Sequence, residues 1–80
     1  MFKINSYHLA QSAISDLKGA IYSLLQNSPK DSLSNAEIGR SLGIYTGHEG
    51  HEGHIPRTLL AMMEEEGVVK QDDNKKWHLL

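Results

Sequence analysis

The 80-residue sequence has no cysteine, no long apolar run and no excess of basic residues. Without cysteine, a disulfide framework and a thiolate zinc site are excluded, so packing alone must hold the core. No apolar run approaches the length that crosses a membrane, and the start MFKINSYH lacks the apolar core of a signal peptide. The expected compartment is therefore the cytoplasm.

The formal net charge is -2, from eight Lys and Arg against ten Asp and Glu. A general nucleic-acid binder usually carries clustered basic residues, because these neutralise phosphates. The charge balance counts against DNA binding but does not exclude it, since the distribution of charge matters more than its sum. The length predicts one domain with a small core, and a large catalytic cleft is not expected.

Apolar residues at helical spacing predict a first helix that begins after Ser12, its expected N-cap, and stops at the Asn27-Ser28-Pro29 segment. The residues of its buried side are Ile14, Leu17, Ile21, Leu24 and Leu25. Residues 1–11 are expected to form an N-terminal arm or an extension of this helix. Gly19 costs about 1 kcal/mol against alanine within a helix, so a neighbouring element is expected to approach it closely.

Two further helices follow. Ser34 and Glu37 have the spacing of a capping box, which predicts a short helix that starts there and stops at Gly43. A third helix is predicted over residues 55–67, because a proline suits a first turn and Gly67 a helix end. Its buried stripe consists of Pro56, Leu59, Leu60 and Met63. Its outward face consists of Arg57, Thr58, Ala61 and Glu65.

The last part of the chain predicts a β-hairpin. Residues 68–71 and 76–79 flank a polar turn at residues 72–75, and a third short strand near Ser32 is expected to pair with them. Trp77 has apolar neighbours in this hairpin and is expected in the core.

Three segments in this order, LSNAEIGRSLGI, RTLLAMMEEEGVVKQ and WHLL, resemble the winged helix-turn-helix superfamily over roughly Ile14 to Leu80. The resemblance implies a small α+β domain over residues 12–80, with three helices followed by a C-terminal two-stranded β-hairpin wing. It also implies a non-catalytic protein that binds double-stranded DNA, as a small transcriptional regulator or as the DNA-binding module of a larger system.

The resemblance also implies where DNA would bind. The third helix, residues 55–67, would lie in the major groove and the wing, residues 72–76, on the DNA backbone. Base edges would be faced by Arg57, Thr58 and Ala61, phosphates would lie near Arg40 and Ser34, and the wing tip would carry Lys75 and Lys76.

The chain departs from this superfamily in the connection before the third helix, where a His/Gly-rich insertion occupies residues 45–54. The motif GHEGHEGH places His48, His51 and His54 three residues apart, with two glutamates between them. These side chains match the ligands of Zn, Ni or Cu, so a metal-responsive regulator is one interpretation. Without cysteine or a second ligand helix this interpretation is the weaker one, and no cofactor is expected.

Two other interpretations of the insertion need no metal. Glycine lets backbone N–H groups approach phosphates closely, and histidine can donate to phosphate oxygens, so the insertion could grip the DNA backbone. It could also be a connector whose histidines are simply solvated or cap the third helix, with His54 placed to do so. Catalysis is not expected, because HEGHEGH is not the helical HExxH arrangement and so short a chain offers no obvious pocket.

A winged-helix module that binds proteins is the alternative function. The acidic charge balance and the single arginine of the third helix fit it. A positive potential on the face that carries Arg40, Arg57 and the wing lysines would favour DNA, and a mixed or acidic one a protein partner. A homodimer is also compatible with the sequence, since two half-sites multiply affinity, and the first helix or the segment before it would supply the contact.

Overall fold

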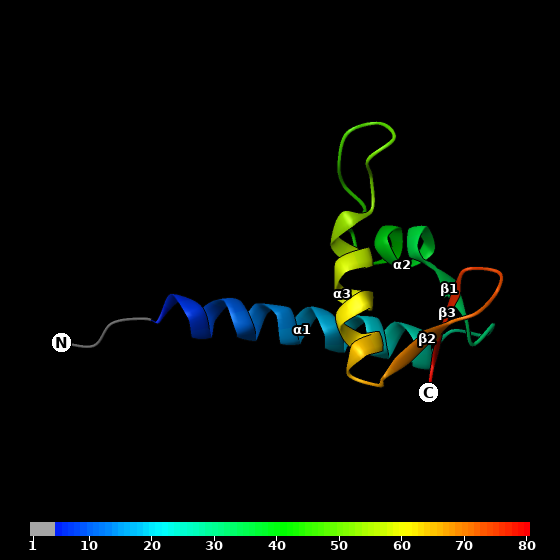
Figure 1. Cartoon of the computed structure of the whole chain (residues 1–80), viewed down its shortest axis with the longest axis horizontal. Helices are drawn as coiled ribbons and strands as arrows, with labels where there is room; N and C mark the ends of the chain where they lie inside the picture. The colour runs from blue at the N-terminus through cyan, green and yellow to red at the C-terminus, as the bar shows by residue number, and fades with distance from the viewer. Residues whose placement is uncertain (1–4) are drawn as a thin grey trace.

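The chain folds into three helices and a three-stranded antiparallel sheet, seen in a computed structural model that describes residues 5–80 (Figure 1). In chain order the elements are α1 (Ser6–Gln26), β1 (Leu33–Ser34), α2 (Asn35–Ser41), α3 (His54–Glu65), β2 (Val69–Gln71) and β3 (Lys76–Leu79). The α+β class and the element order agree with the prediction. Within residues 5–80, no helix combines the length and the apolarity that a membrane span requires.

α1 begins earlier than its apolar pattern predicts. The Asn5 side chain is the N-cap and accepts hydrogen bonds from the N–H groups of Tyr7 (2.9 Å) and His8 (3.2 Å). The prediction of Ser12 as N-cap is wrong, because Asn5 caps equally well and no helix breaker separates the two residues. Residues 6–11 therefore extend the helix, while the predicted arm over residues 1–4 lies outside the described residues.

In α1, the predicted neighbour of Gly19 is corrected and the predicted end of the helix is confirmed. A Cβ built on Gly19 meets no atom within 4 Å, so the predicted close neighbour is absent there and Gly19 faces solvent. The helix ends at Gln26 with Asn27 as its C-cap, as the sequence predicts.

β1 and α2 meet at the predicted capping box. The Ser34 Oγ accepts a hydrogen bond from the N–H of Glu37 (3.1 Å), and the Glu37 carboxylate accepts one from the N–H of Ser34 (2.8 Å). Both groups would otherwise be unpaired at a helix start. α2 is followed by Gly43 with a φ of 72°, the left-handed stop that the sequence predicts.

The sheet is ordered β1-β3-β2, so β3 is its central strand. Leu33 pairs with Trp77 on one side, and Gln71 pairs with Trp77 on the other. The hairpin is therefore not a free two-stranded wing, because the predicted third strand lies at Leu33–Ser34 and joins it. The exposed fraction of Trp77 is 6%, which confirms its predicted place in the core.

The core lies where α1, α2 and α3 meet the sheet. Its buried members are Ile21, Leu25, Ile38, Leu59, Leu60, Met63, Val69 and Trp77. The predicted buried stripe of α3, including Pro56, is confirmed. The N-terminal half of α1 extends well beyond this core, and the connection between α2 and α3 projects from the top of the body (Figure 1).

Candidate nucleic-acid interface

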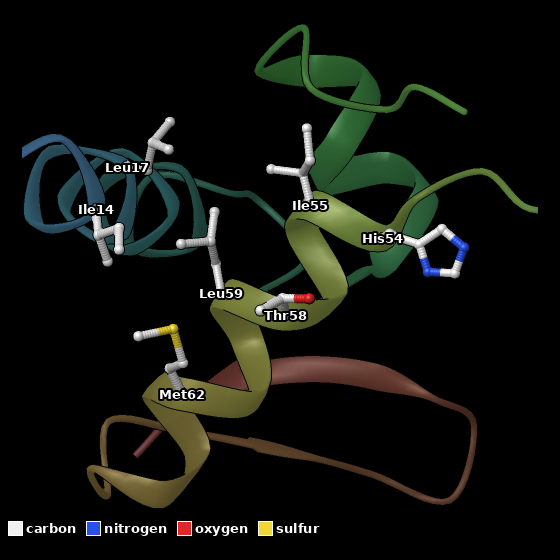
Figure 2. A pocket seen from close by; sticks show the side chains of 7 residues that line it. All are labelled: Ile14, Leu17, His54, Ile55, Thr58, Leu59 and Met62. Carbon is white, nitrogen blue, oxygen red and sulfur yellow. The ribbon is translucent and has the colours of Figure 1, made fainter. Parts of the chain in front are cut away.

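The outward face of α3 is formed by exposed side chains on the side opposite its buried stripe. Arg57, Thr58, Ala61 and Glu65 are all exposed, as predicted, and His54 joins them at the helix start. In Figure 2, Leu59 points toward α1 while His54 and Thr58 point elsewhere. Packing of the stripe therefore fixes which side chains α3 presents to a partner.

His54 and Arg57 lie side by side on this face. The Arg57 Nη1 is 3.3 Å from the His54 Nδ1. Guanidinium can only donate, so this contact makes Nδ1 the acceptor and leaves the ring proton on Nε2. The pair thus presents one imidazole N–H and the remaining N–H groups of the guanidinium side by side on the exposed face of α3.

The first turn of α3 has no side-chain cap. Gly53 is the N-cap, with a φ of 79°, and His54 is already the first helical residue. The interpretation in which His54 caps the helix is therefore wrong, because the chain enters α3 through a left-handed residue that only glycine adopts readily. The positive end of the α3 dipole points toward the connection before it.

That connection is anchored by Tyr45, whose ring is wedged between α2 and the start of α3. A Cβ on Gly39 would lie 2.9 Å from the Tyr45 Cβ and 3.0 Å from the Pro56 Cγ. A Cβ on Gly53 would lie 2.7 Å from the Tyr45 Cε1. Gly39 therefore permits a close approach, by Tyr45 and Pro56.

Two polar contacts complete the anchor. The Asn35 Nδ2 donates to the Gly53 carbonyl at 3.1 Å, which ties the start of α2 to the start of α3. The Arg40 guanidinium lies over the Tyr45 ring, 4.7 Å from its centroid, in a cation–π contact. Arg40 is exposed, so its charge stays available to solvent and to a phosphate.

Residues 46–53, here termed the His/Gly loop, form a closed excursion above this anchor. The Gly53 N–H donates to the Thr46 carbonyl (3.1 Å), and the His51 N–H donates to the His48 carbonyl (2.8 Å). The rings of His51 and His54 stack with centroids 6.5 Å apart. His48 and His51 are both exposed.

The His/Gly loop does not gather its histidines around one point. Over residues 5–80, no group of three His, Asp or Glu side chains is placed to hold a metal ion. The metal-responsive interpretation of His48, His51 and His54 thus has no support in this geometry, whereas the exposed imidazoles remain accessible to a phosphate.

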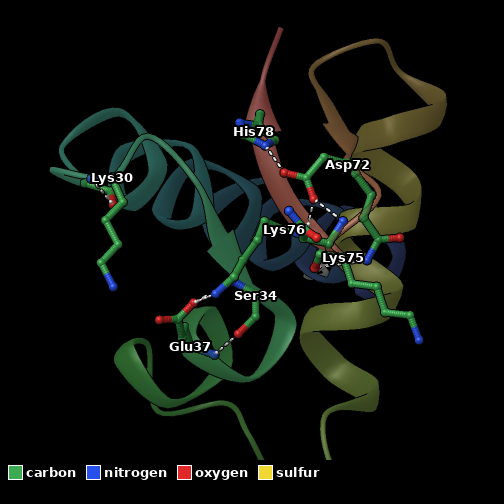
Figure 3. Close-up of polar contacts among 10 residues, drawn as sticks. Lys30, Ser34, Glu37, Asp72, Lys75, Lys76 and His78 are labelled. Carbon is green, nitrogen blue, oxygen red and sulfur yellow. Dashed lines mark hydrogen bonds and ion pairs between the residues drawn. The ribbon is translucent and has the colours of Figure 1, made fainter.

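The predicted phosphate contacts Ser34, Lys75 and Lys76 lie at or beside the β2–β3 hairpin, and they differ in whether Glu37 already binds them (Figure 3). Lys76 forms an ion pair with Glu37, at 2.9 Å, and Ser34 is engaged in the capping box with the same carboxylate. Lys75 has an exposed side chain and a φ of 62°. Of the two lysines, only Lys75 has no ion pair with an acid within residues 5–80.

The Glu37 carboxylate is held strongly in its ionised form. The hydrogen bond from the Ser34 N–H, followed by that from Lys76, lowers the pKa of Glu37 to about 2. An acid that joins β1, α2 and β3 in this way fixes the hairpin against α2, at the cost of placing a negative charge beside Ser34 and Lys76.

A second carboxylate organises the hairpin turn. Asp72 accepts hydrogen bonds from the N–H groups of Asn74 (2.8 Å) and Lys76 (2.9 Å), and its other oxygen lies 2.6 Å from the His78 Nε2. The bond to His78, then that from the Lys76 N–H, lowers the pKa of Asp72. The turn that carries Lys75 is thereby held in one conformation.

The exposed charges around α3 are mixed in sign. The exposed basic side chains of this region are Arg40, Arg57 and Lys75. The exposed acidic ones are Glu49, Glu64, Glu65, Glu66 and Asp73. The two glutamates of α3 lie at its C-terminal end, so the basic and hydrogen-bonding side chains are concentrated in its first two turns.

Sequence reasoning missed Tyr45 and Asn35, which position the start of α3. A signal for Tyr45 was present, because it is an aromatic residue that follows Ile44 between Gly43 and Gly47, in a connection that is polar from Thr46 onward. No such signal marked Asn35, whose contact with Gly53 joins residues 18 positions apart.

Comparison of the chain with protein-family models, with curated proteins and with solved structures finds no match.

Proposed function

We propose that this chain is a non-catalytic module that binds double-stranded DNA, acting in the cytoplasm as a small transcriptional regulator of the winged helix-turn-helix type. The observation that carries the proposal is the outward face of α3. Its first two turns present Arg57, Thr58 and Ala61, one cation, one hydroxyl and one small side chain, on a helix whose opposite side is fully buried. A face of this kind is the part of a helix that reads base edges when a recognition helix lies in a major groove.

The surroundings of α3 supply the backbone contacts in this proposal. The His/Gly loop extends from the N-terminal end of α3 and carries the exposed His48 and His51. The Arg40 guanidinium lies over the ring of Tyr45, at the base of this connection. Lys75 is the exposed cation of the hairpin turn. Ser34 and Lys76 are weaker contacts, because Glu37 already binds both.

A protein-binding module is the second candidate, and the mixed charge around α3 favours it. Glu37 neutralises Lys76, and the C-terminal end of α3 carries two exposed acids. A surface of alternating sign suits a protein partner better than a polyanion.

The test is binding to duplex DNA by fluorescence anisotropy across a salt series. We expect log K to fall linearly with log salt, with a slope equal to roughly three to six phosphate contacts at about 0.9 per phosphate. Arg57→Ala should reduce this slope by about one unit or abolish preference at one base pair. Lys18→Ala is the control, because it removes one positive charge from α1, where Lys18 pairs with Glu66 at the C-cap of α3, at 2.7 Å.

Absence of binding at low salt would refute the DNA proposal and leave the protein-binding module as the better account. An equal loss in the Lys18→Ala control would show that binding follows net charge and not the α3 face.

A further inference from the structure

A cavity lies at the C-terminal end of α1, where this helix meets the end of the central strand β3. It has a volume of about 290 Å³. The residues that line it are Leu25 and Gln26 of α1, Asp31 of the following loop, and His78 and Leu79 of β3. None of the side chains assigned above to DNA contact lines this cavity, so it belongs to a separate part of the surface.

The end of α1 gives the cavity a negative potential. The backbone carbonyls of the last turn of a helix lack intrahelical partners and together act as about half a negative charge. The N–H groups of Asn27 and Ser28 donate to the carbonyls of Ser23 and Leu25, so within residues 5–80 the Gln26 carbonyl receives no backbone hydrogen bond. The last turn of α1 contains no basic residue that would compensate this charge.

Asp31 adds a full negative charge to the lining. Its side chain is exposed and forms no ion pair within residues 5–80. Lys30 precedes it, but Figure 3 shows the Lys30 side chain extending away from His78. Lys70 lies opposite His78 on β2, whereas β1 and the loop before it lie on the other side of β3. Neither lysine lines the cavity, so no cation of the described residues fills it.

The imidazole of His78 contributes another hydrogen-bond acceptor. Its Nε2 lies 2.6 Å from the carboxylate of Asp72, and this hydrogen bond is the main cause that lowers the pKa of Asp72. An ionised carboxylate only accepts, so Nε2 carries the proton. In a neutral imidazole the other ring nitrogen, Nδ1, is then an acceptor, and Figure 3 shows it turned away from Asp72.

We propose that this cavity binds an alkylammonium group, either the side chain of a lysine or a free aliphatic amine. The three N–H groups of an ammonium match three acceptors of the lining, the Asp31 carboxylate, the His78 Nδ1 and the Gln26 carbonyl. Leu25 and Leu79 provide apolar surface for the methylene chain, as in the packing of lysine stems. The helix end and Asp31 repel an anion, and an uncharged apolar molecule would leave the acceptors unpaired. This inference does not rest on DNA binding.

The first test is an NMR titration of the full chain with butylammonium chloride at constant ionic strength. We expect saturating shifts of the backbone amide signals of Gln26, Asp31 and His78. The neutral control is 1-butanol, which has the same carbon chain and should leave these signals in place. Shifts that never saturate, or equal shifts with 1-butanol, would overturn the proposal.

A parallel titration with Nα-acetyl-lysine amide distinguishes the two sources of the group. Binding of either compound supports the site itself. Tighter binding of the lysine derivative assigns the site to a protein partner, and tighter binding of butylammonium assigns it to a free amine.

The contribution of Asp31 is tested by Asp31→Asn, which keeps the shape and removes the charge. Asp31 has a φ of 58°, a backbone conformation that asparagine also tolerates, so the loop should be preserved. We expect butylammonium binding to weaken about fivefold or more. The matched control is Asp73→Asn, because Asp73 is an exposed carboxylate that does not line the cavity. Equal weakening by both variants would show attraction by net charge alone and reject the site.

A last test fills the cavity from within the chain. Gln26→Lys places an ammonium at the end of α1, so it should abolish the butylammonium shifts and raise Tm by about 2–5 °C. Gln11→Lys is the same substitution at an exposed position of α1 away from the cavity, and should leave amine binding unchanged. Undiminished amine binding in Gln26→Lys, or an equal loss in Gln11→Lys, would contradict this assignment.

Discussion

Gly19 and Gly39 both lie inside helices, yet their surroundings are opposite. Around Gly19 a Cβ would meet no atom within 4 Å, whereas on Gly39 it would lie 2.9 Å from Tyr45. We expect Gly19→Ala to raise the free energy of unfolding by about 0.5–1 kcal/mol, through helix propensity. Gly39→Ala should lower it by about 1–2 kcal/mol, because overcrowding at Tyr45 outweighs the same gain.

Urea denaturation of the two variants checks this pair, and each serves as the control of the other. Equal stabilisation by both substitutions would mean that Tyr45 is not wedged against α2. The sequence predicted a close neighbour for Gly19, which has none, whereas Gly39 has one. Only the fold distinguishes the two glycines.

Glu37 gives the stability a specific dependence on pH. Its pKa falls from 4.5 to about 2 on folding, so its contribution is complete above pH 4.5 and is lost as the pH drops toward 2. Glu37→Gln should flatten this part of the acid unfolding curve, measured by circular dichroism at a series of pH values. Glu65→Gln, an exposed carboxylate on α3, is the control and should leave the curve unchanged. Identical curves for both variants would contradict the role of the capping box.

At the scale of the elements, the hairpin turn has a lysine in a left-handed backbone conformation that glycine adopts more readily. Lys75 has a φ of 62°, a conformation that costs a side-chain-bearing residue about 1 kcal/mol or more. We expect Lys75→Gly to stabilise the domain by about 0.5–1 kcal/mol, and to weaken DNA binding with a smaller salt slope. Thermal unfolding and anisotropy on the same variant separate the two effects.

Lys70→Ala provides the comparison, because Lys70 is an exposed cation on β2 outside the turn. A loss of DNA binding in this variant as large as that in Lys75→Gly would argue against a contact by the turn.

The elements also show why prediction succeeded for the fold and less well for the site. Caps and periodicity are local signals, so the capping box at Ser34, the stop at Gly43 and the stripe of α3 were all predicted correctly. The engagement of Lys76 by Glu37 joins residues 39 positions apart, and no local pattern encodes it. The start of α1 was missed for another reason, since Asn5 and Ser12 are equally good caps.

None of the eight buried core residues lies in the His/Gly loop, and the loop is closed at its base by the hydrogen bond between Gly53 and Thr46. At the scale of the whole molecule, the residues that form the core and the exposed residues of the loop thus lie in separate parts of the chain. The loop repeats a Gly-His-Glu triplet, and closing a loop twice as long costs only about 0.6 kcal/mol more. Gain or loss of one triplet would therefore change the reach of the molecule in a fixed step while leaving it folded, an evolutionary freedom that α3 does not have.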